Sequence, residues 1–217
     1  TGPKGIVRWV RWSPDGRRVA ASSDDGTAWV WEVAGEATPV VLRGHEGRVW
    51  QVAWSPDGAE VATAGLDGTA RLWRADGNGT AVVLRGHEGQ VMTVSWSGDG
   101  RHVLTGSADG TARIWAADGA APPVVFGRHE LGITDARFSP DGTHLATVSE
   151  DRTARIWPVR LPNPWAFPRG AEGTVTALAN ATRAGLSLAQ GIENVAQETP
   201  EPLATELHRI VRTIGEV

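Results

Sequence analysis

Apolar residues between positions 49 and 84 fall in short runs that end at turn signals. The first run ends at Ser55-Pro56-Asp57-Gly58, where proline presets the φ of a type I turn, aspartate accepts backbone hydrogen bonds and glycine takes the left-handed position. Asp67-Gly68, after the second run, is a hairpin signal. This short spacing is typical of strands rather than helices. It predicts antiparallel strands at about residues 49–54, 60–65, 70–73 and 80–84.

The same unit recurs along the chain with a period of 42 residues. Four sets of positions keep the interval, namely Trp31, Trp73, Trp115 and Trp157; Asp25, Asp67, Asp109 and Asp151; Asp15, Asp57, Asp99 and Asp141; and His45, His87 and His129. A fixed period of this length is the signature of a repeat architecture. We therefore expect an all-β repeat protein with units at about residues 6–42, 48–84, 90–126 and 133–157.

The pattern changes after residue 158. Prolines interrupt the stretch in which the fourth unit would have its outer strand, and proline is tolerated only at a sheet edge. Residues 161–167 are the candidate for that strand, and 159–172 as a whole are expected to be a proline-rich linker. The prolines are Pro158, Pro162, Pro164 and Pro168.

From about residue 173 the apolar residues have helical spacing. Ser187 with Gln190 three residues later is a capping-box start, and Thr199-Pro200 places proline at the first position of a helix. Residues 173–217 are therefore expected to form a helical tail of two short helices and a longer one.

Composition excludes several classes of function. The 217 residues carry a net charge of −4, so no basic field favours nucleic acid or anionic lipid. There is no cysteine for disulfide or thiolate chemistry, and no apolar run is long enough to span a membrane. The chain starts without a signal-peptide core or an initiator methionine, so we expect a cytoplasmic fragment of a longer protein. The 11 tryptophans, with no tyrosine, suit fixed positions in an array of strands.

Over about residues 5–158 the repeat resembles the WD-repeat β-propeller family. Gly44-His45, Gly86-His87 and the looser Arg128-His129 stand where that family has its Gly-His. The tryptophans stand at the family's Trp-Asp dipeptide, although the residues that follow them here are Glu32, Arg74, Ala116 and Pro158. The resemblance implies an arc of four four-stranded blades. Because the family usually closes its ring with more than four blades, we expect an open or incomplete ring with exposed first and last faces.

The resemblance also implies a hydrogen-bonded tetrad inside each blade, made by the Gly-His histidine, a second-strand threonine, the turn aspartate and the indole. A buried carboxylate and imidazole are tolerated only when paired, and a buried indole N–H needs an acceptor. The first blade has Asp25 and Trp31 but no histidine, which we attribute to a chain that begins too late to include it. The implied structural tetrads are His45, Thr63, Asp67 and Trp73; His87, Thr105, Asp109 and Trp115; and His129, Thr147, Asp151 and Trp157.

No catalytic or metal-binding pattern stands apart from the repeat. Each histidine has its own aspartate and tryptophan nearby, so a structural role is expected and no metal or other cofactor is predicted. Asp24-Asp25 and Glu150-Asp151 are paired acids, but one member of each is the repeat's own aspartate. There is no Ser-His-Asp order and no phosphate loop, and the tryptophans read as core rather than as a platform for stacked bases. Beyond the tetrads, no polar residues are expected to converge near the axis.

Positions that differ among otherwise similar units are free to serve recognition. One such position lies at the start of the first strand of each unit, and the other lies just before the turn aspartate. In the WD-repeat family both lie on the top face near the channel, where partners commonly dock, and Trp, Met and Arg are enriched at interfaces. Neutral drift is the alternative explanation of these differences. The candidate partner-binding residues are Arg8, Trp50, Met92 and Thr134, and Asp24, Leu66, Ala108 and Glu150.

The sequence thus favours a non-catalytic scaffold that binds a protein or peptide on the top face, with self-association through the open blade faces as an option. It predicts neither nucleic-acid binding nor membrane insertion. One alternative is a small-ligand binder or enzyme that uses the central channel. Another places function in the tail, as part of a secretion or pilus platform.

The tail is similar to the opening helices of the type II secretion system F domain, which is found in pilus and secretion platform proteins. An amphipathic tail packed on the open end of the arc, or a join between unrelated reading frames, is the other interpretation. The residues that carry the similarity are Leu178-Ala179-Asn180, Arg183-Ala184-Gly185-Leu186-Ser187-Leu188, Val195-Ala196, Pro202 and Glu206-Leu207.

Overall fold

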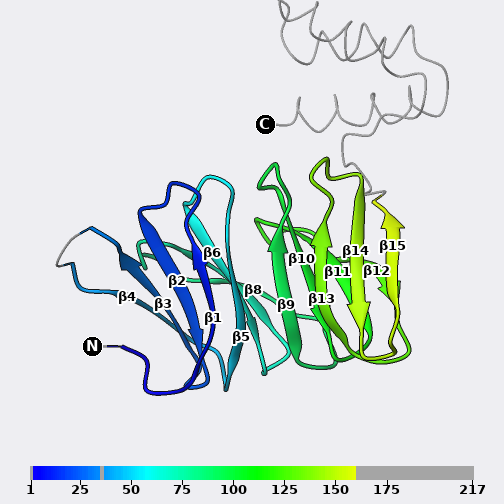
Figure 1. The fold of residues 1–217 in the computed structure, drawn as a ribbon, viewed down its shortest axis with the longest axis horizontal. Coiled ribbons are helices and arrows are strands. Elements are labelled where there is room, and N and C mark those ends of the chain that lie inside the picture. Colours follow the sequence, from blue (N-terminus) through cyan, green and yellow to red (C-terminus); the bar gives the residue numbers. More distant parts are fainter. Residues whose placement is uncertain (1, 35–36, 160–217) are drawn as a thin grey trace, which may run out of the picture. The chain divides into compact units, whose positions relative to one another are not determined.

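The computed structural model describes residues 2–34 and 37–159, which form four antiparallel sheets (Figure 1). The first sheet contains β1 (Val7–Trp12), β2 (Arg18–Ser23), β3 (Thr27–Glu32) and β4 (Val40–Arg43). The second contains β5 (Val49–Trp54), β6 (Glu60–Gly65), β7 (Ala70–Arg74) and β8 (Val82–Leu84). The third contains β9 (Val91–Trp96), β10 (His102–Ser107), β11 (Thr111–Ala116) and β12 (Val124–Arg128). The fourth contains β13 (Ile133–Phe138), β14 (His144–Ser149) and β15 (Ala154–Pro158).

The prediction of an all-β protein built from successive antiparallel sheets is confirmed. Three sheets have four strands each, but within the described residues the fourth sheet has three. The expectation of four strands is therefore confirmed for the first three sheets, and the outer strand expected for the fourth sheet falls on residues after 159. The candidate fourth strand at 161–167, the linker from residue 160 onward and the helical tail at 173–217 lie outside the described residues.

The Ser-Pro-Asp-Gly turn that joins the first two strands of a sheet is locked by its own side chains. Ser55 Oγ donates to Asp57 Oδ1 at 2.6 Å and accepts the Glu60 N–H at 2.9 Å. Gly58 has a φ of +70°, a conformation that a residue with a Cβ rarely adopts. The serine–aspartate bond recurs in the corresponding turns at Ser13, Ser97 and Ser139. These turns fix the register of each hairpin from local sequence alone.

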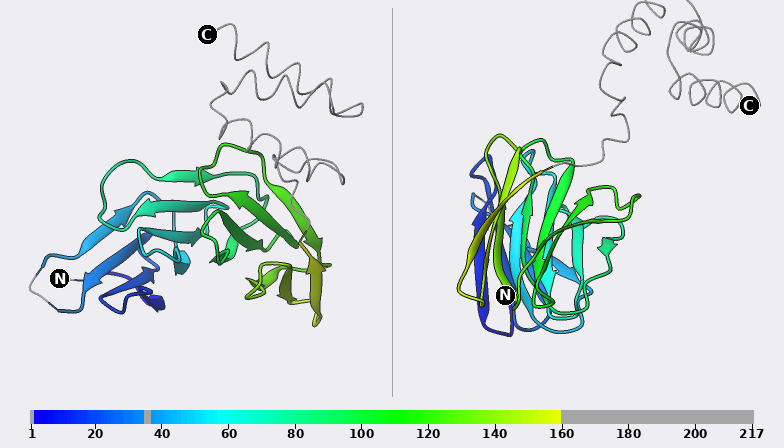
Figure 2. Two further views of the ribbon diagram at one scale, coloured as in Figure 1. Left: turned by 90° about the horizontal axis from the view of Figure 1, so that it is seen from above. Right: turned by 90° about the vertical axis from the view of Figure 1, so that its right-hand side faces the viewer.

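The sheets lie side by side in chain order, with their inner strands β1, β5, β9 and β13 adjacent (Figure 2). At the first junction, small residues such as Ala20 and Ala28 on the first sheet leave room for Val52 and Trp54 on the second. Similar apolar clusters join the second sheet to the third and the third to the fourth. The core therefore lies between sheets, and each sheet depends on its neighbour for burial.

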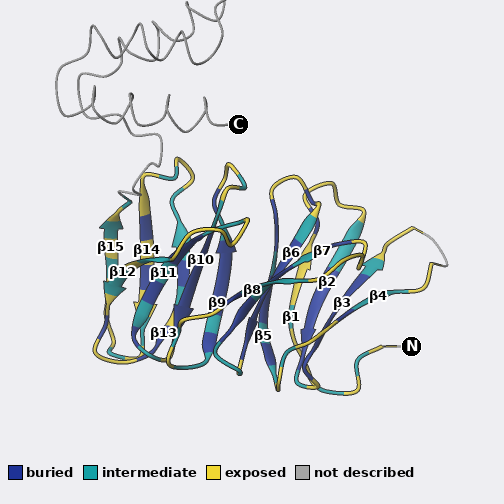
Figure 3. Cartoon of the chain, turned by 180° about the vertical axis from the view of Figure 1, so that it is seen from behind, coloured by how far each residue is buried: buried dark blue, intermediate teal, exposed yellow. Residues whose placement is uncertain are grey.

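The two end sheets each keep one apolar face that no described residue covers. Val10 and Trp12 of β1 are exposed, as are Val148 of β14 and Ile156 of β15. Figure 3 shows the contrast between exposed β1 and the largely buried β5 and β9. Among the described residues, no helix is long and apolar enough to cross a membrane.

Candidate functional site

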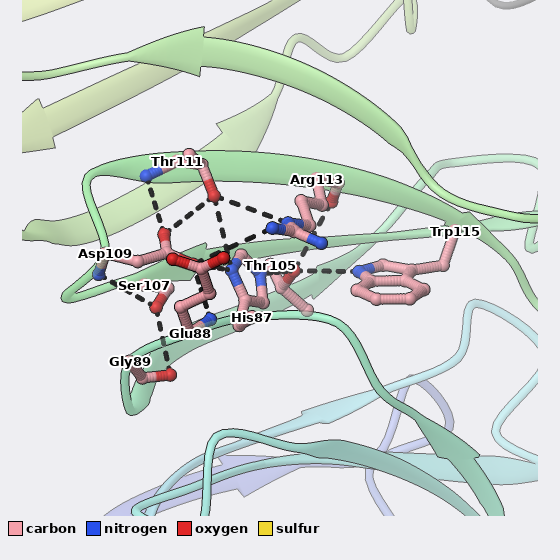
Figure 4. A network of polar contacts seen from close by, with 9 residues as sticks. All are labelled: His87, Glu88, Gly89, Thr105, Ser107, Asp109, Thr111, Arg113 and Trp115. Carbon is pink, nitrogen blue, oxygen red and sulfur yellow. Dashed lines mark hydrogen bonds and ion pairs between the residues drawn. The ribbon is translucent and has the colours of Figure 1, made fainter.

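The buried polar network of the third sheet consists of Trp115, Thr105, His87 and Asp109 (Figure 4). The Trp115 indole N–H donates to Thr105 Oγ1 at 2.8 Å. His87 Nε2 lies 2.7 Å from the same Thr105 oxygen, and His87 Nδ1 lies 2.8 Å from Asp109 Oδ2. With a neutral imidazole, Nδ1–H donates to the carboxylate and Nε2 accepts the threonine hydroxyl. The four groups therefore form one continuous line of hydrogen bonds.

The ionisation of this network follows from its surroundings. Burial raises the pKa of Asp109, but hydrogen bonds from Thr111 and His87 outweigh this effect and lower it to about 2. Burial lowers the pKa of His87, and the neighbouring Asp109 opposes that change. Asp109 also accepts the Glu88 N–H at 3.0 Å. Both nitrogens of the histidine and both oxygens of the aspartate are thus engaged, which leaves the pair a structural element rather than a reactive one.

The second and fourth sheets contain the same arrangement. In the second sheet, His45 lies 2.7 Å from Thr63 and 3.0 Å from Asp67, while Trp73 donates to Thr63 at 2.9 Å. In the fourth, the corresponding distances are 2.7 Å between His129 and Thr147, 2.8 Å between His129 and Asp151, and 3.0 Å between Trp157 and Thr147. The structure thus brings together all twelve residues implied to form tetrads.

Two further members of each network were missed by the sequence analysis. A threonine two residues after the turn aspartate donates to its Oδ1, as Thr111 does to Asp109 at 2.7 Å. An arginine two residues further on lies near the same carboxylate, as Arg113 does at 3.9 Å. Both positions recur at the interval of 42 residues, so the period alone could have identified them. The counterparts are Thr69 and Thr153, and Arg71 and Arg155.

The first sheet replaces the polar network with stacked tryptophans. Trp29 occupies the arginine position, stacks on Trp31 with 5.8 Å between ring centroids, and donates its indole N–H to Thr27 at 2.7 Å. Pro3 and Ala21 occupy the histidine and threonine positions. The attribution of the missing histidine to a late chain start is therefore wrong, because the position is present and holds proline. The first sheet lacks the tetrad through substitution.

The candidate partner-binding residues lie along one edge of the sheets, where the inner strands begin. Three of them, Arg8, Asp24 and Trp50, lie close together, and Trp50 is half-buried. Arg8 donates two hydrogen bonds to Asp24, at 2.8 and 2.6 Å, and its guanidinium lies 5.7 Å from the Trp50 ring centroid. These bonds lower the pKa of Asp24.

Two residues that the sequence analysis did not single out complete this group, which we call the Trp50 ridge (Arg8, Asp24, Arg48, Trp50 and Gln90). The Arg48 guanidinium lies 4.6 Å from the Trp50 ring centroid, and Arg48 Nε lies 2.6 Å from Asp24 Oδ1 as an ion pair. The Trp50 indole N–H donates to Gln90 at 3.1 Å. The ridge therefore crosses three successive sheets.

The other candidate residues on this edge do not join the ridge. Leu66 lies against Gly47 and remains exposed, and Met92 is half-buried. Thr134, Ala108 and Glu150 are exposed on the third and fourth sheets. The edge is thus organised at its first two junctions and open at the third.

Polar residues also line the inner strands. The Thr93 hydroxyl lies 2.9 Å from Gln51 Oε1 and 2.8 Å from Asp135 Oδ1, and Val94 N–H donates to Gln51 at 2.7 Å. Arg137 pairs with Asp135 at 3.2 Å. We expected no polar residues beyond the tetrads to converge near the axis. This expectation is wrong, because these side chains meet along the inner strands. Gln51 and Thr93 are buried and bonded to each other, so they hold successive inner strands together.

The comparisons with known proteins match this geometry. Residues 1–32, 38–74, 79–116 and 121–158 fit the family model described as WD domain, G-beta repeat. Each match from the second onward begins with the outer strand of the preceding sheet, as residues 38–74 begin with β4, so successive repeats are linked by a shared sheet. A 46-residue stretch is 41% identical to human WD repeat-containing protein 86; it covers 21% of this chain and 12% of that protein.

Within the described residues, no group of three potential metal ligands is present.

Proposed function

Because this chain belongs to the WD-repeat family, we propose that it is a non-catalytic scaffold that binds a protein or peptide along the edge that carries the Trp50 ridge. WD repeats generally mediate protein–protein interaction, which supports binding as a class. The fold alone does not name a partner, so the proposal depends on the chemistry of that edge.

The observation that supports the proposal is the set of contacts around Trp50 in the Trp50 ridge. Arg8 and Arg48 both approach its ring, and Asp24 pairs with both arginines. Tryptophan and arginine are the residue types that dominate binding energy at interfaces, because they combine a large apolar area with fixed polar groups. A half-buried ring held by its neighbours also loses little side-chain entropy when a partner covers it. The ridge thus offers a preorganised anchor.

Affinity measurements on selected peptides test this proposal. Random peptides displayed on phage are panned on residues 1–217, and calorimetry measures the affinity of the enriched peptides for matched variants. Trp50→Ala should weaken binding about 30-fold, the effect of losing a hot spot worth about 2 kcal/mol. Trp12→Ala, on an end face, is the control and should change it little. Enriched peptides that bind Trp50→Ala and Arg48→Ala as tightly as the unmodified chain would contradict the proposal.

We further propose that the two exposed end faces cover each other between two copies of the chain. Val10 and Trp12 on β1 correspond to Val52 and Trp54, which pack against the preceding sheet inside the molecule. Ile156 corresponds to Leu72, which packs toward the following sheet. A second copy can therefore repeat a contact that the chain already makes three times.

Light scattering after gel filtration measures this association directly. The native mass of residues 1–217 should exceed that of a monomer and return to it in Ile156→Glu. Trp12→Glu should have the same effect, because the contact is head to tail and each substitution removes one of its halves. A wild-type chain that stays monomeric at the highest concentration tested would show that the end faces do not pair.

A further inference from the structure

The junction between the first and second sheets holds a guanidinium group at the edge opposite the Trp50 ridge. Arg18, at the start of β2, places its guanidinium carbon 4.8 Å from the centroid of the Trp54 ring. Its Nη2 donates to the Gly58 carbonyl at 2.7 Å. The Trp54 indole is fixed in turn, because its N–H donates to the Arg11 carbonyl at 3.1 Å. The chain therefore fills this place with its own cation.

The next junction has the same frame without the cation. The residues 42 positions later are Glu60, Trp96 and Gly100, so glutamate replaces Arg18. The Trp96 indole is oriented as Trp54 is, since its N–H donates to the Ala53 carbonyl at 3.3 Å. A hollow of about 160 Å³ lies here between the turns of the second and third sheets, lined by Trp96 and Glu60 among others.

The charges around this hollow favour a cation. Burial and the neighbouring Asp57 raise the pKa of Glu60, and Arg74 offsets this effect only in part. Arg74 lies across the strand pair from Glu60, but its guanidinium donates two hydrogen bonds to Asp76, at 2.7 and 3.2 Å. Asp57 and Asp99 also line the hollow, each held by the serine of its own turn. Three acidic residues thus line the same hollow as Trp96.

The size of the hollow suits a planar group. A cavity of roughly 150 Å³ holds a benzene molecule in another protein, and a guanidinium is smaller than benzene. Guanidinium stacks on an aromatic face while donating in its plane, which matches the Arg18 geometry one junction earlier. The third junction has His102 and Phe138 at the equivalent positions, so neither the carboxylate nor the indole is repeated there.

We propose that the hollow between the second and third sheets binds an arginine side chain of a partner protein, stacked on Trp96 and paired with Glu60. The site lies at the edge opposite the Trp50 ridge, because β5 runs from Trp50 to the Ser55–Gly58 turn. It is therefore a second recognition site, independent of the proposed function of that ridge. The chain itself shows the bound geometry in Arg18.

Nuclear magnetic resonance of the indole N–H groups tests this site on residues 1–217. The probes are N-acetyl-argininamide and, as the matched control, N-acetyl-lysinamide. The Trp96 signal, assigned by its loss in Trp96→Phe, should shift saturably with the arginine probe and much less with the lysine probe. Glu60→Gln should weaken binding of the arginine probe roughly tenfold, because it removes a charge-assisted hydrogen bond. Glu88→Gln, an exposed acid on the ridge edge, should not change it.

The sharpest variant is Glu60→Arg, which restores the residue type found at Arg18. Its own guanidinium should fill the hollow, abolish binding of the probe, and move the Trp96 signal in the direction that the probe moves it in the unmodified chain. Trp50→Ala should leave the arginine probe unaffected, which separates this site from the ridge. An unshifted Trp96 signal, equal shifts with both probes, or unchanged binding in Glu60→Gln and Glu60→Arg would overturn the proposal.

Discussion

The inner junctions and the end faces use equivalent residues in opposite environments. Trp54 on β5 is 9% exposed, whereas Trp12, at the same repeat position on β1, is 61% exposed. Leu72 on β7 is 3% exposed, whereas Ile156, its counterpart on β15, is 75% exposed. The sheets that carry these residues have the same hydrogen-bonding pattern. The comparison shows that a sheet positions an apolar side chain but the next sheet decides whether it is buried.

The largest effect is expected for tryptophan at the first junction. Trp54→Ala should lower the free energy of unfolding by about 3–5 kcal/mol, because it removes a buried aromatic and leaves a cavity between two sheets. Trp12→Ala should change it by less than about 0.5 kcal/mol, as for other exposed sites. Urea denaturation of the two variants at a dilution that keeps the chain monomeric gives both values. Equal losses would mean that the end face is covered within the monomer.

A slightly smaller contrast is expected for the aliphatic pair. Leu72→Ala should cost about 2–5 kcal/mol, depending on how far the second and third sheets close over the cavity. Ile156→Ala should cost less than about 0.5 kcal/mol in the monomer. The same denaturation experiment is repeated at high protein concentration. If two copies cover this face, the loss of unfolding free energy in Ile156→Ala should be larger at that concentration. A loss for Ile156→Ala that does not depend on concentration would contradict this assignment.

The smallest of the three effects depends on pH, unlike the apolar contacts of the junctions. Asp109 has its pKa lowered from 3.8 to about 2, so its pairing stabilises the fold fully above pH 3.8 and this stabilisation is lost as the pH falls through 2. Asp109→Asn should therefore cost on the order of 2 kcal/mol at pH 5, and the cost should shrink towards pH 2.

Denaturation at a series of pH values from 5 to 2 measures this difference. Trp12→Ala serves as the control, and its pH profile should run parallel to that of the unmodified chain. A cost for Asp109→Asn that stays constant down to pH 2 would show that the carboxylate acts through shape rather than through charge.

Local sequence predicted the parts of the structure that depend on near neighbours. The Ser-Pro-Asp-Gly turn closes through bonds between Ser55 and Asp57, two residues apart, so its residues specify it. The period of 42 residues placed His87, Asp109 and Trp115 at equivalent positions, and resemblance to the family implied their pairing. Arg113 and Thr111 also recur with this period, but the resemblance to the family assigned them no part in the tetrad, so the sequence analysis did not predict their contacts with Asp109.

Contacts between different sheets were the part that the sequence analysis did not predict. Arg48 and Gln90 join Trp50 only because neighbouring sheets bring their strand ends together. Gln51 and Thr93 are one period apart in the sequence, and their hydrogen bond joins two inner strands of neighbouring sheets.

Local sequence specified the strands and turns of each sheet, because hairpins form between residues that are close along the chain. Tertiary structure decided which apolar faces are buried and which polar side chains meet, because those outcomes depend on the sheet that packs alongside. Glu60 and Arg18 illustrate the difference. Their positions in the repeat are the same, but only the stacked sheets show that one side chain fills the space beside a tryptophan and the other borders a hollow.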